Sequence, residues 1–362
     1  MSDTMLAAIF QGPGDLELER RPVPQIIAAD DVIIRVGAVG ICGSDLHALH
    51  NPPEHPGHPG VIFGHEFCGE IVAVGPAVKN VAVGDSVAVD QNPPCGRCGP
   101  CKDGRPNFCE PLFDNPYLDY AWPNTPGFFW DGGMAEYVKV PAYFTYKVDP
   151  DVPKHLIVLA EPLGCALNAV NKVEPMLGEH AVVIGAGPIG LLCIMALRHA
   201  GVGTITVIEP SETRAAVALE VGADAVVNPI TQDAAAAVRE RTDGKGAAII
   251  IEAVGSQLDA AIELAADEAR IAVIGINSAY HASFSPITLT TKELRIVGVF
   301  LMRYTMQQAL DLIQSNALPL ERIVSHVLPL DQVQEGIDLA RRGEGLKIVF
   351  TPNGSATTKG SN

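Results

Sequence analysis

Four cysteines lie within fifteen residues of this 362-residue chain, at Cys95, Cys98, Cys101 and Cys109. Their C-x2-C-x2-C-x7-C spacing lets four thiolates converge on one tetrahedral zinc ion. Because four sulfur ligands leave no open position for a substrate, we expect this zinc to be structural. An iron–sulfur cluster is the alternative, since thiolates suit both metals.

A second group of possible metal ligands occurs earlier in the chain, in the segments Cys42–His47 and Gly64–Glu66. Together these segments supply a thiolate, an imidazole and a carboxylate, and a catalytic zinc keeps three protein ligands with one exchangeable position. Taken singly, a cysteine is usually buried packing and a histidine is usually a surface residue. A dinucleotide-binding motif later in the same chain favours the catalytic interpretation.

That motif runs from Gly185 to Gly190 and follows the apolar segment Val182–Ile184. It reads Gly185-Ala186-Gly187-Pro188-Ile189-Gly190, which is G-x-G-x-x-G between an expected strand and an apolar helix. The first glycine permits the tight turn, the second the approach of a pyrophosphate, and the third the packing of helix on strand. The helix N-terminus then faces the phosphates. A glycine-rich turn without a ligand is the alternative.

An acidic residue, Glu209, follows the next expected strand, Thr204–Ile208, and stands nineteen residues beyond Gly190. This is the place for a carboxylate that accepts hydrogen bonds from the adenosine ribose hydroxyls. Because that carboxylate would repel a 2′-phosphate, we predict NAD rather than NADP as the cofactor. Arg214, five residues later, is expected to stack on the adenine.

The elements that must position these residues fall into two halves. Up to about residue 148 the chain shows short apolar strands broken by Gly, Pro and Asp, namely Met5–Phe10, Asp31–Val39, Phe67–Val74 and Ser86–Val89. After Pro153 strands alternate with helices, which predicts an α/β fold with a parallel, doubly wound sheet. We expect its strands at Ala181–Ile184, Thr204–Glu209, Ala225–Val227, Ala247–Ala253 and Arg270–Ile276.

The regular alternation fades towards the end of the chain. A strand-like run, Leu294–Phe300, precedes the segments Tyr304–Gln314, Ile323–Leu330, Asp331–Arg341 and Lys347–Phe350, where the chain could return to the first half. The tail Thr351–Asn362 is rich in Ser, Thr and Gly and is predicted to be disordered.

Charge and composition exclude several classes of protein. With 42 acidic and 25 basic residues the formal net charge is −17, which repels phosphate backbones and anionic lipid head groups. We therefore expect neither nucleic acid nor a membrane as a partner. The apolar run Ala181–Leu197 contains three glycines and a proline, so we interpret it as soluble core. No secretory signal is recognised, and thiolate metal ligands favour a reducing cytoplasm.

Taken together, these motifs resemble the zinc-dependent medium-chain dehydrogenase/reductase superfamily, which includes alcohol, polyol and threonine dehydrogenases. The similarity rests on the order and spacing of Cys42–His47, Gly64–Gly69 with Val74-Gly75, Gly84-Asp85, the four-cysteine lobe, Glu161-Pro162-Leu163 and the glycine motif. It implies a GroES-like β-rich catalytic domain at residues 1–154 and 297–350, with the zinc lobe at 92–110. A Rossmann NAD-binding domain would occupy residues 155–296.

The resemblance also implies roles for individual residues. The catalytic zinc would be held by Cys42, His65 and one or both of Glu66 and Glu161. We expect one of the two carboxylates to bind the zinc while the other does not contact it. Ser44 would take the proton of the substrate hydroxyl and pass it through the nicotinamide ribose to His47. Each chain would thus hold two zinc ions and NAD, and the chains would form a homotetramer or homodimer.

The substrate is less well defined by the sequence. Zinc acts as a Lewis acid that lowers the pKa of an alcohol, and hydride then passes from the carbinol carbon to nicotinamide C4. The family branch suggests a secondary alcohol or polyol. In polyol dehydrogenases of the sorbitol type an Arg-Tyr pair directly follows Gly-Val-Phe and binds sugar hydroxyls. Here Leu301-Met302 separates Gly298-Val299-Phe300 from Arg303-Tyr304, which disfavours a sugar alcohol. Eight aromatics between Phe108 and Trp130 form either a packing loop or an apolar wall for a bulky or cyclic secondary alcohol.

A function of another class stays open as the alternative. Related proteins without a catalytic zinc serve as quinone or carbonyl reductases or in structural roles, and a four-cysteine lobe alone could be an interaction module. The complete set of catalytic zinc ligands favours the enzyme, because a binding protein has no chemical reason to keep it.

Overall fold

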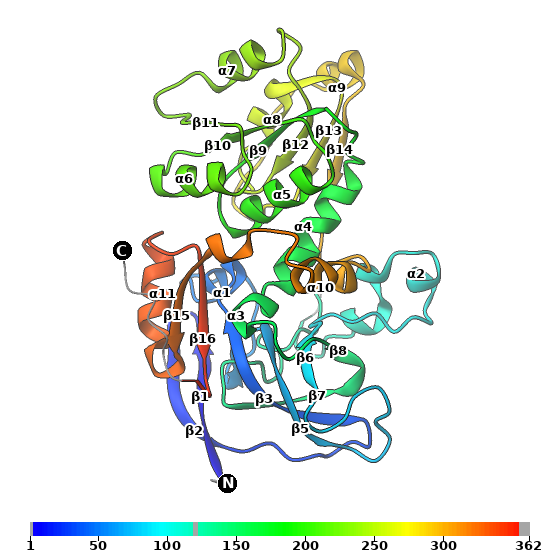
Figure 1. The fold of residues 1–362 in the computed structure, drawn as a ribbon, viewed down its shortest axis with the longest axis vertical. Coiled ribbons are helices and arrows are strands. Elements are labelled where there is room, and N and C mark those ends of the chain that lie inside the picture. Colours follow the sequence, from blue (N-terminus) through cyan, green and yellow to red (C-terminus); the bar gives the residue numbers. More distant parts are fainter. Residues whose placement is uncertain (1–2, 119–121, 355–362) are drawn as a thin grey trace. The chain divides into compact units, whose positions relative to one another are not determined.

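A computed structural model describes residues 3–118 and 122–354 of the chain, which folds into two compact units (Figure 1). Unit 1 comprises Met1–Glu161, Met306–Ser315 and Val324–Asn362, and unit 2 comprises Pro162–Thr305 and Asn316–Ile323. Residues 355–362, most of the tail predicted to be disordered, lie outside the described residues, as does Tyr120 of the aromatic segment. No helix in the described part of the chain is long and apolar enough to cross a membrane.

Unit 1 is built on β-sheets. Its larger sheet has seven strands among the described residues, in the order β15-β16-β3-β5-β6-β8 with β7 beside β3. The strands are β3 (Asp31–Gly40), β5 (Glu66–Val74), β6 (Ser86–Val89), β7 (Tyr137–Pro141), β8 (Thr145–Lys147), β15 (Val324–Pro329) and β16 (Lys347–Thr351). A smaller sheet pairs β1 (Thr4–Gly12) with β2 (Asp15–Pro22) and β4 (Val61–Ile62). Ile34, Phe67 and Phe350 lie in the shared apolar core.

Short helices connect these strands and hold the chemistry-bearing segments. They are α1 (Gly43–Ala48), α2 (Gly99–Lys102), α3 (Lys154–Ile157), α10 (Met306–Gln314) and α11 (Val333–Arg341). Single turns of 3-10 helix lie at η1 (Pro106–Phe108), η2 (Glu110–Phe113), η3 (Ala142–Phe144) and η5 (Leu330–Gln332). Helix α4 (Ala160–Lys172) begins with the last two residues of the first segment of unit 1 and continues in unit 2.

Unit 2 is an α/β fold around a parallel sheet, as predicted. In the described residues its order is β11-β10-β9-β12-β13-β14, and every pairing is parallel. The strands are β9 (His180–Ile184), β10 (Thr204–Ile208), β11 (Ala225–Val227), β12 (Ala247–Glu252), β13 (Ala265–Val273) and β14 (Arg295–Gly298). The helices are α5 (Pro188–His199), α6 (Glu212–Glu220), α7 (Ala234–Arg241), α8 (Leu258–Leu264) and α9 (Pro286–Lys292), with the turn η4 (Leu320–Arg322).

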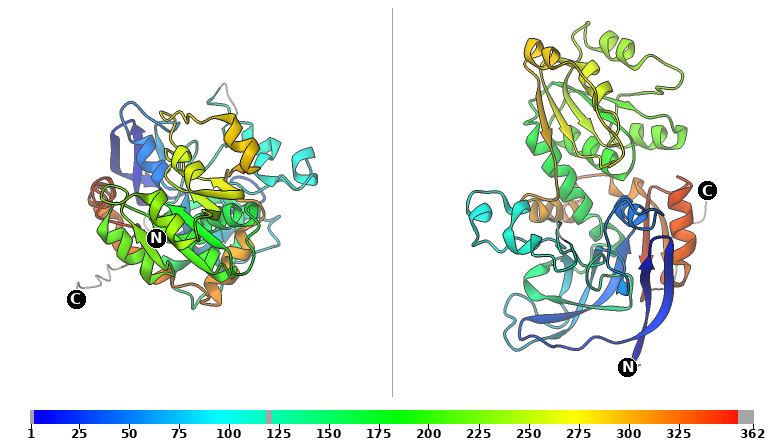
Figure 2. Two further views of the ribbon diagram at one scale, coloured as in Figure 1. Left: turned by 90° about the horizontal axis from the view of Figure 1, so that it is seen from above. Right: turned by 180° about the vertical axis from the view of Figure 1, so that it is seen from behind.

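Helices α5 and α6 pack against each other, and so do α7 and α8. Figure 2 shows the ribbon from two further sides. The order of the sheet reverses at β9, since β10 pairs with one side of β9 and β12 with the other. In an open α/β sheet this switch point is where ligands bind, at the carboxyl ends of the strands. The strand β9 leads directly into the glycine motif.

Several strands differ from the sequence-based expectation. Strand β13 ends at Val273 rather than Ile276, and β14 pairs with it through Arg270↔Arg295 to Val273↔Gly298, so β14 and β11 are the two edge strands of the described sheet. Strands β2, β4, β7 and β8 were not predicted. Strand β2 consists mostly of charged residues and alternates them only with Leu16 and Leu18, of which Leu16 packs against the core. It follows a tight turn and pairs with β1 along its whole length.

Candidate functional site

Helix α1 places Cys42 and the Asp45 side chain beside His65. Cys42 is the N-cap of α1, and its backbone N–H donates to Oδ2 of Asp45 at 2.8 Å. Oδ1 of the same carboxylate lies 3.2 Å from Nδ1 of His65, and both side chains are buried. Asp45 therefore orients the cysteine backbone and the imidazole ring together, as outer-shell carboxylates do in metal sites.

Glu66 begins β5 next to His65 and is fully buried. The ligand atoms of Cys42, His65 and Glu66 lie within 4.8 Å of one another. Oε2 of Glu66 accepts a hydrogen bond from Nζ of Lys347, the first residue of β16, which also donates to the carbonyl of Ile41 at 3.0 Å. The space for this ion pair exists because residue 40 is glycine: a Cβ there would lie 2.5 Å from the Glu66 carboxylate.

The electrostatics of this site favour a bound cation. Burial by itself lowers the pKa of His65, but Asp45 and Cys42 outweigh it and raise that pKa well above its ordinary value. Burial likewise opposes the charged form of Lys347, yet Glu66 and Cys42 raise its pKa. Among the described residues, Oε1 of Glu66 is buried without a hydrogen-bond partner. A thiolate, an imidazole and an unpaired carboxylate oxygen fit a zinc ion.

Glu161 lies apart from this group of ligand atoms. It belongs to the first turn of α4, is buried, and accepts a hydrogen bond through Oε1 from Nε2 of Gln91. The structure thus brings three of the four predicted ligands together and holds the fourth on a glutamine amide. In this arrangement Glu66 is the carboxylate next to Cys42 and His65.

The two residues of the predicted proton path lie on α1. Ser44 and His47 are both partly exposed, and Nδ1 of His47 lies 2.5 Å from Oε2 of Glu54. The pKa of Glu54 is lowered by hydrogen bonds from His47 and from His50. Neither Glu54 nor His50 was expected from the sequence.

The four-cysteine lobe converges as its spacing predicts. The sulfur atoms of Cys95, Cys98, Cys101 and Cys109 lie within 4.8 Å of one another, and none of the eight cysteines, all of which are described, is in a disulfide. Backbone N–H groups of Arg97 and Cys98 point at the sulfur of Cys95 and lower its pKa to about 6. Burial instead raises the pKa of Cys109 to about 12. Backbone donors aimed at sulfur stabilise the thiolate that a metal requires.

The glycine motif joins β9 to α5 with the local geometry that the sequence predicts. Gly185 has φ +92°, a left-handed conformation that favours glycine, and Gly187 is the N-cap of α5. A Cβ on Gly190 would lie 1.9 Å from the carbonyl of Gly185, whereas one on Gly187 would meet nothing within 4 Å. Gly190 is therefore required for packing, and the space beside Gly187 is open.

A pocket of about 460 Å³ adjoins this motif within unit 2 and is lined by Gly185, Gly187, Glu209 and Arg214. Glu209 is buried, and both carboxylate oxygens accept backbone hydrogen bonds, from Ala186 at 2.7 Å and Ser211 at 2.8 Å. The two bonds hold the carboxylate at the carboxyl end of β10. Among the described lining residues three are acidic and one, Arg214, is basic.

Aromatic rings pack beside His65, one of the predicted zinc ligands. The ring of Phe128 lies 4.9 Å from that of His65 and 4.2 Å from that of His55, and His55 lies 5.0 Å from Trp122. Burial lowers the pKa of His55 to about 4, so its imidazole is neutral at pH 7. Nδ1 of His55 lies 2.8 Å from the carbonyl of Pro56, which assigns the ring proton to Nδ1 and leaves Nε2 as an acceptor.

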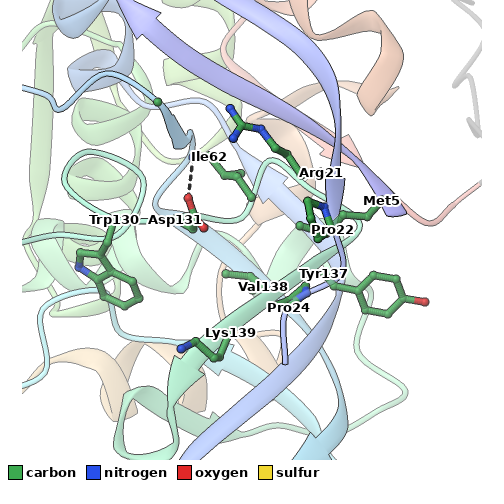
Figure 3. Close-up of a pocket in the computed structure, with 11 residues that line it drawn as sticks. Met5, Arg21, Pro22, Pro24, Ile62, Trp130, Asp131, Tyr137, Val138 and Lys139 are labelled. Atoms are coloured by element: carbon green, nitrogen blue, oxygen red, sulfur yellow. Dashed lines mark hydrogen bonds between the residues drawn. The ribbon is translucent and has the colours of Figure 1, made fainter. Parts of the chain in front are cut away.

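Another pocket, of about 410 Å³, lies in unit 1, and none of the predicted site residues lines it (Figure 3). Figure 3 shows Arg21, Trp130, Asp131 and Lys139 around it, with Asp131 accepting a hydrogen bond from the backbone of Ile62. Its lysine pairs with Asp31 at 3.4 Å. This pocket lacks a nucleophile or a metal-ligand set and contributes nothing to the chemistry above.

Several residues of the site were not predicted from the sequence. Asp45 and Gln91 orient expected ligands, and Lys347 neutralises Glu66 although 281 residues separate the pair in sequence. Asp45 stands between Cys42 and His47 in the expected motif, so its position could have suggested a role. Lys347 gives no local signal beyond a lysine at the start of an apolar strand.

Two family models match the chain. The model described as "Alcohol dehydrogenase GroES-like domain" matches residues 28–150, and that described as "Zinc-binding dehydrogenase" matches residues 188–315. Sorbitol dehydrogenase of Bombyx mori is 31% identical over 359 residues, which cover 95% of this chain and 97% of the relative. Erythritol/L-threitol dehydrogenase of Mycolicibacterium smegmatis is 33% identical over 366 residues, covering 97% and 98%.

A solved structure agrees with these relatives. A zinc-binding dehydrogenase from Sinorhizobium meliloti 1021, bound to NADP, is similar with a TM-score of 0.88 and 30% identity, covering 97% of this chain and all of that one. The resemblance inferred from the motifs is therefore confirmed: the chain belongs to the zinc-binding medium-chain dehydrogenase/reductase family, whose members are oxidoreductases acting on CH–OH donors.

Proposed function

We propose that this protein is an NAD-dependent zinc alcohol dehydrogenase that interconverts a secondary alcohol and its ketone. The observation that carries the proposal is the buried set Cys42, His65 and Glu66, whose ligand atoms converge within 4.8 Å and leave Oε1 of Glu66 unpaired among the described residues. The catalytic domain expected at residues 1–154 and 297–350 would correspond to unit 1, and the NAD-binding domain expected at 155–296 would correspond to unit 2, with the boundaries moved to Glu161/Pro162 and Thr305/Met306 so that β14 stays in the parallel sheet.

In the proposed resting site zinc is held by Cys42, His65 and Glu66, with Glu161 held back by Gln91. Lys347 supports this assignment because its charge offsets that of Glu66 without reaching Oε1. The four-cysteine lobe would hold a second, structural zinc, and an iron–sulfur cluster stays the alternative for that lobe. Elemental analysis for zinc and iron distinguishes the two.

The catalytic zinc, when bound, supplies Lewis-acid polarisation of the substrate oxygen. The chain's own residues would handle the proton: Ser44 accepts it from the substrate hydroxyl, and His47 exchanges it with solvent. His47 is suited to this role because its side chain is 37% exposed and its Nδ1 is held by Glu54, which orients the ring.

NAD is proposed over NADP because of the charge around the pocket in unit 2. Glu209 accepts hydrogen bonds from two backbone N–H groups, so its carboxylate cannot turn away from a 2′-phosphate without breaking both bonds. The NADP bound to the similar structure from Sinorhizobium meliloti 1021 belongs to that protein and makes this preference a point to test.

For the substrate we propose a secondary alcohol with a bulky or cyclic apolar flank. Phe128, Trp122 and the neutral His55 form an aromatic wall beside His65. A diol or polyol is the second candidate, favoured by the names of the relatives and by the acceptor Nε2 of His55, which could accept a hydrogen bond from a second hydroxyl.

We also propose a homodimer or homotetramer, located in the cytoplasm. Strand β14 is one of the two edge strands of the described parallel sheet, and an edge strand invites pairing across a two-fold axis. Eight cysteines without a disulfide among them fit a reducing compartment. A monomer mass by light scattering at micromolar concentration would contradict the assembly.

The test of the function is a screen of NADH production over cyclic alcohols, acyclic secondary alcohols, diols, polyols and amino-acid alcohols. We expect two zinc ions per chain and the highest kcat/KM for an alcohol with an apolar flank. Cys42→Ser, the matched control, should retain the lobe zinc and the fold but lose turnover. One zinc per chain together with no turnover on any alcohol would contradict the proposal and favour a binding or structural role.

A further inference from the structure

A third group of possible metal ligands lies at the end of α1, apart from both sites above. Nδ1 of His47 and Nδ1 of His50 lie 2.5 Å and 3.3 Å from the two carboxylate oxygens of Glu54. The ligand atoms of the three residues all lie within 4.8 Å of one another. None of these residues belongs to the Cys42 set or to the four-cysteine lobe.

The backbone builds this cluster. The carbonyl of His47 accepts hydrogen bonds from the N–H groups of His50 at 3.4 Å and Glu54 at 2.9 Å, which folds the chain after α1 back onto the helix end. The two imidazole rings meet edge to face with centroids 5.7 Å apart. The side chains are 37%, 46% and 44% exposed, so a hydrated ion can reach them from solvent.

Two imidazoles and one carboxylate are ligands that zinc commonly takes, with water in the remaining position. The carboxylate is ionised at neutral pH, because hydrogen bonds from His47 and then His50 lower the pKa of Glu54. We propose that His47, His50 and Glu54 form a third zinc site, one that exchanges with solvent and that neither the structural nor the catalytic role requires.

Occupation of this site would act on the reaction, a consequence that rests on the function proposed above. A neutral imidazole bound to a metal through Nδ1 carries its one ring proton on Nε2 and has no lone pair left to accept another. His47 would then be unable to take up the substrate proton. Zinc beyond two equivalents per chain should therefore slow alcohol oxidation reversibly.

The experiment measures zinc binding and turnover separately. The protein holding two zinc ions is equilibrated by dialysis against increasing free Zn²⁺, and bound zinc is counted by elemental analysis. We expect a third equivalent in the natural protein and in His281→Gln, a control that removes an exposed histidine of unit 2. His50→Gln and Glu54→Gln should weaken the third equivalent at least tenfold, as expected when a ligand is lost.

Turnover is then followed over the same zinc series. Inhibition should appear as the third equivalent of zinc binds and should be reversed by mild chelation. In His50→Gln, which changes a residue outside the proton path, inhibition should require at least a tenfold higher zinc concentration. A count that stops at two, or a third equivalent that both variants retain, would overturn the site. Binding of a third zinc that both variants weaken, without inhibition of turnover, would support the site but overturn its link to the proton transfer by His47. Failure of the proposed function differs from both, because turnover is then absent before zinc is added.

Discussion

Replacement of Glu209 by Gln is the sharpest test of cofactor choice. The substitution keeps the size of the side chain and removes its charge. In the structure each carboxylate oxygen accepts one backbone N–H, from Ala186 and from Ser211. A glutamine can accept only through its one oxygen, so one of these donors loses its acceptor and the side chain is less firmly held.

The size of the effect follows from these contacts. If the proposed role of Glu209 is right, NADP in the natural protein would meet the repulsion of Glu209 and forfeit the ribose hydrogen bonds to a charged acceptor, together about 2–4 kcal/mol. That free energy corresponds to a preference for NAD of roughly 30- to 1,000-fold in kcat/KM. Glu209→Gln removes the repulsion and weakens the hydrogen bonds, so the preference should fall at least about tenfold.

The measurement is the ratio of kcat/KM for NAD to that for NADP at one fixed alcohol concentration. A ratio is insensitive to the fraction of folded enzyme, which matters because an unpaired N–H costs about 1–3 kcal/mol of stability. Asp233→Asn is the matched control. Asp233 lines the same pocket, is exposed, and caps α7 by accepting from the N–H of Ala236, a role that Asn fills equally well.

For the control we expect a change of no more than about fivefold, since exposed charge interactions are worth about 0.2–1 kcal/mol. A natural protein that uses both cofactors equally would refute the assignment of Glu209. So would a Glu209→Gln ratio within about threefold of the natural one.

Three further variants test the metal sites. Lys347→Met should lower the free energy of unfolding in urea by about 3–5 kcal/mol, because it leaves the buried charge of Glu66 without its partner. The double variant with Glu66→Gln should recover most of this loss. If the losses of the two single variants simply add up in the double variant, the pairing is contradicted. Cys98→Ser should lower the melting temperature and zinc content but keep turnover per folded molecule, whereas Cys42→Ser should abolish turnover with far less effect on melting. Equal melting and retained activity in both would contradict the two-site division. His47→Gln should lower oxidation roughly 10- to 100-fold at pH 7, a deficit that shrinks at higher pH or with added imidazole; a constant deficit would contradict the relay.

The features predicted well from the sequence are those whose determinants lie close together in it. The four cysteines, the glycine motif and the strand–helix alternation each span a few residues or one repeating unit. Strand β11 was predicted to the residue, at Ala225–Val227, and α5 starts at the predicted Pro188. The parallel sheet followed from that rhythm alone.

Three of the features that were missed depend on residues far apart in the sequence. Lys347 reaches Glu66 only because β16 pairs with β3, which also pairs with β5. Glu161 differs from Glu66 in that it accepts a hydrogen bond from Gln91, a residue that belongs to none of the sequence motifs. The edge position of β14 likewise depends on the strand order, which a single sequence does not specify.

The ion pair between Lys347 and Glu66 also bears on the order in which unit 1 can fold. The two residues are 281 positions apart, and all of unit 2 lies between them in the sequence. The loop-closure entropy of such a contact must be overcome before the contact stabilises the fold. The buried charge of Glu66 is therefore offset only once β16 has paired with β3, which makes the pairing of these two strands a late step in the folding of the larger sheet.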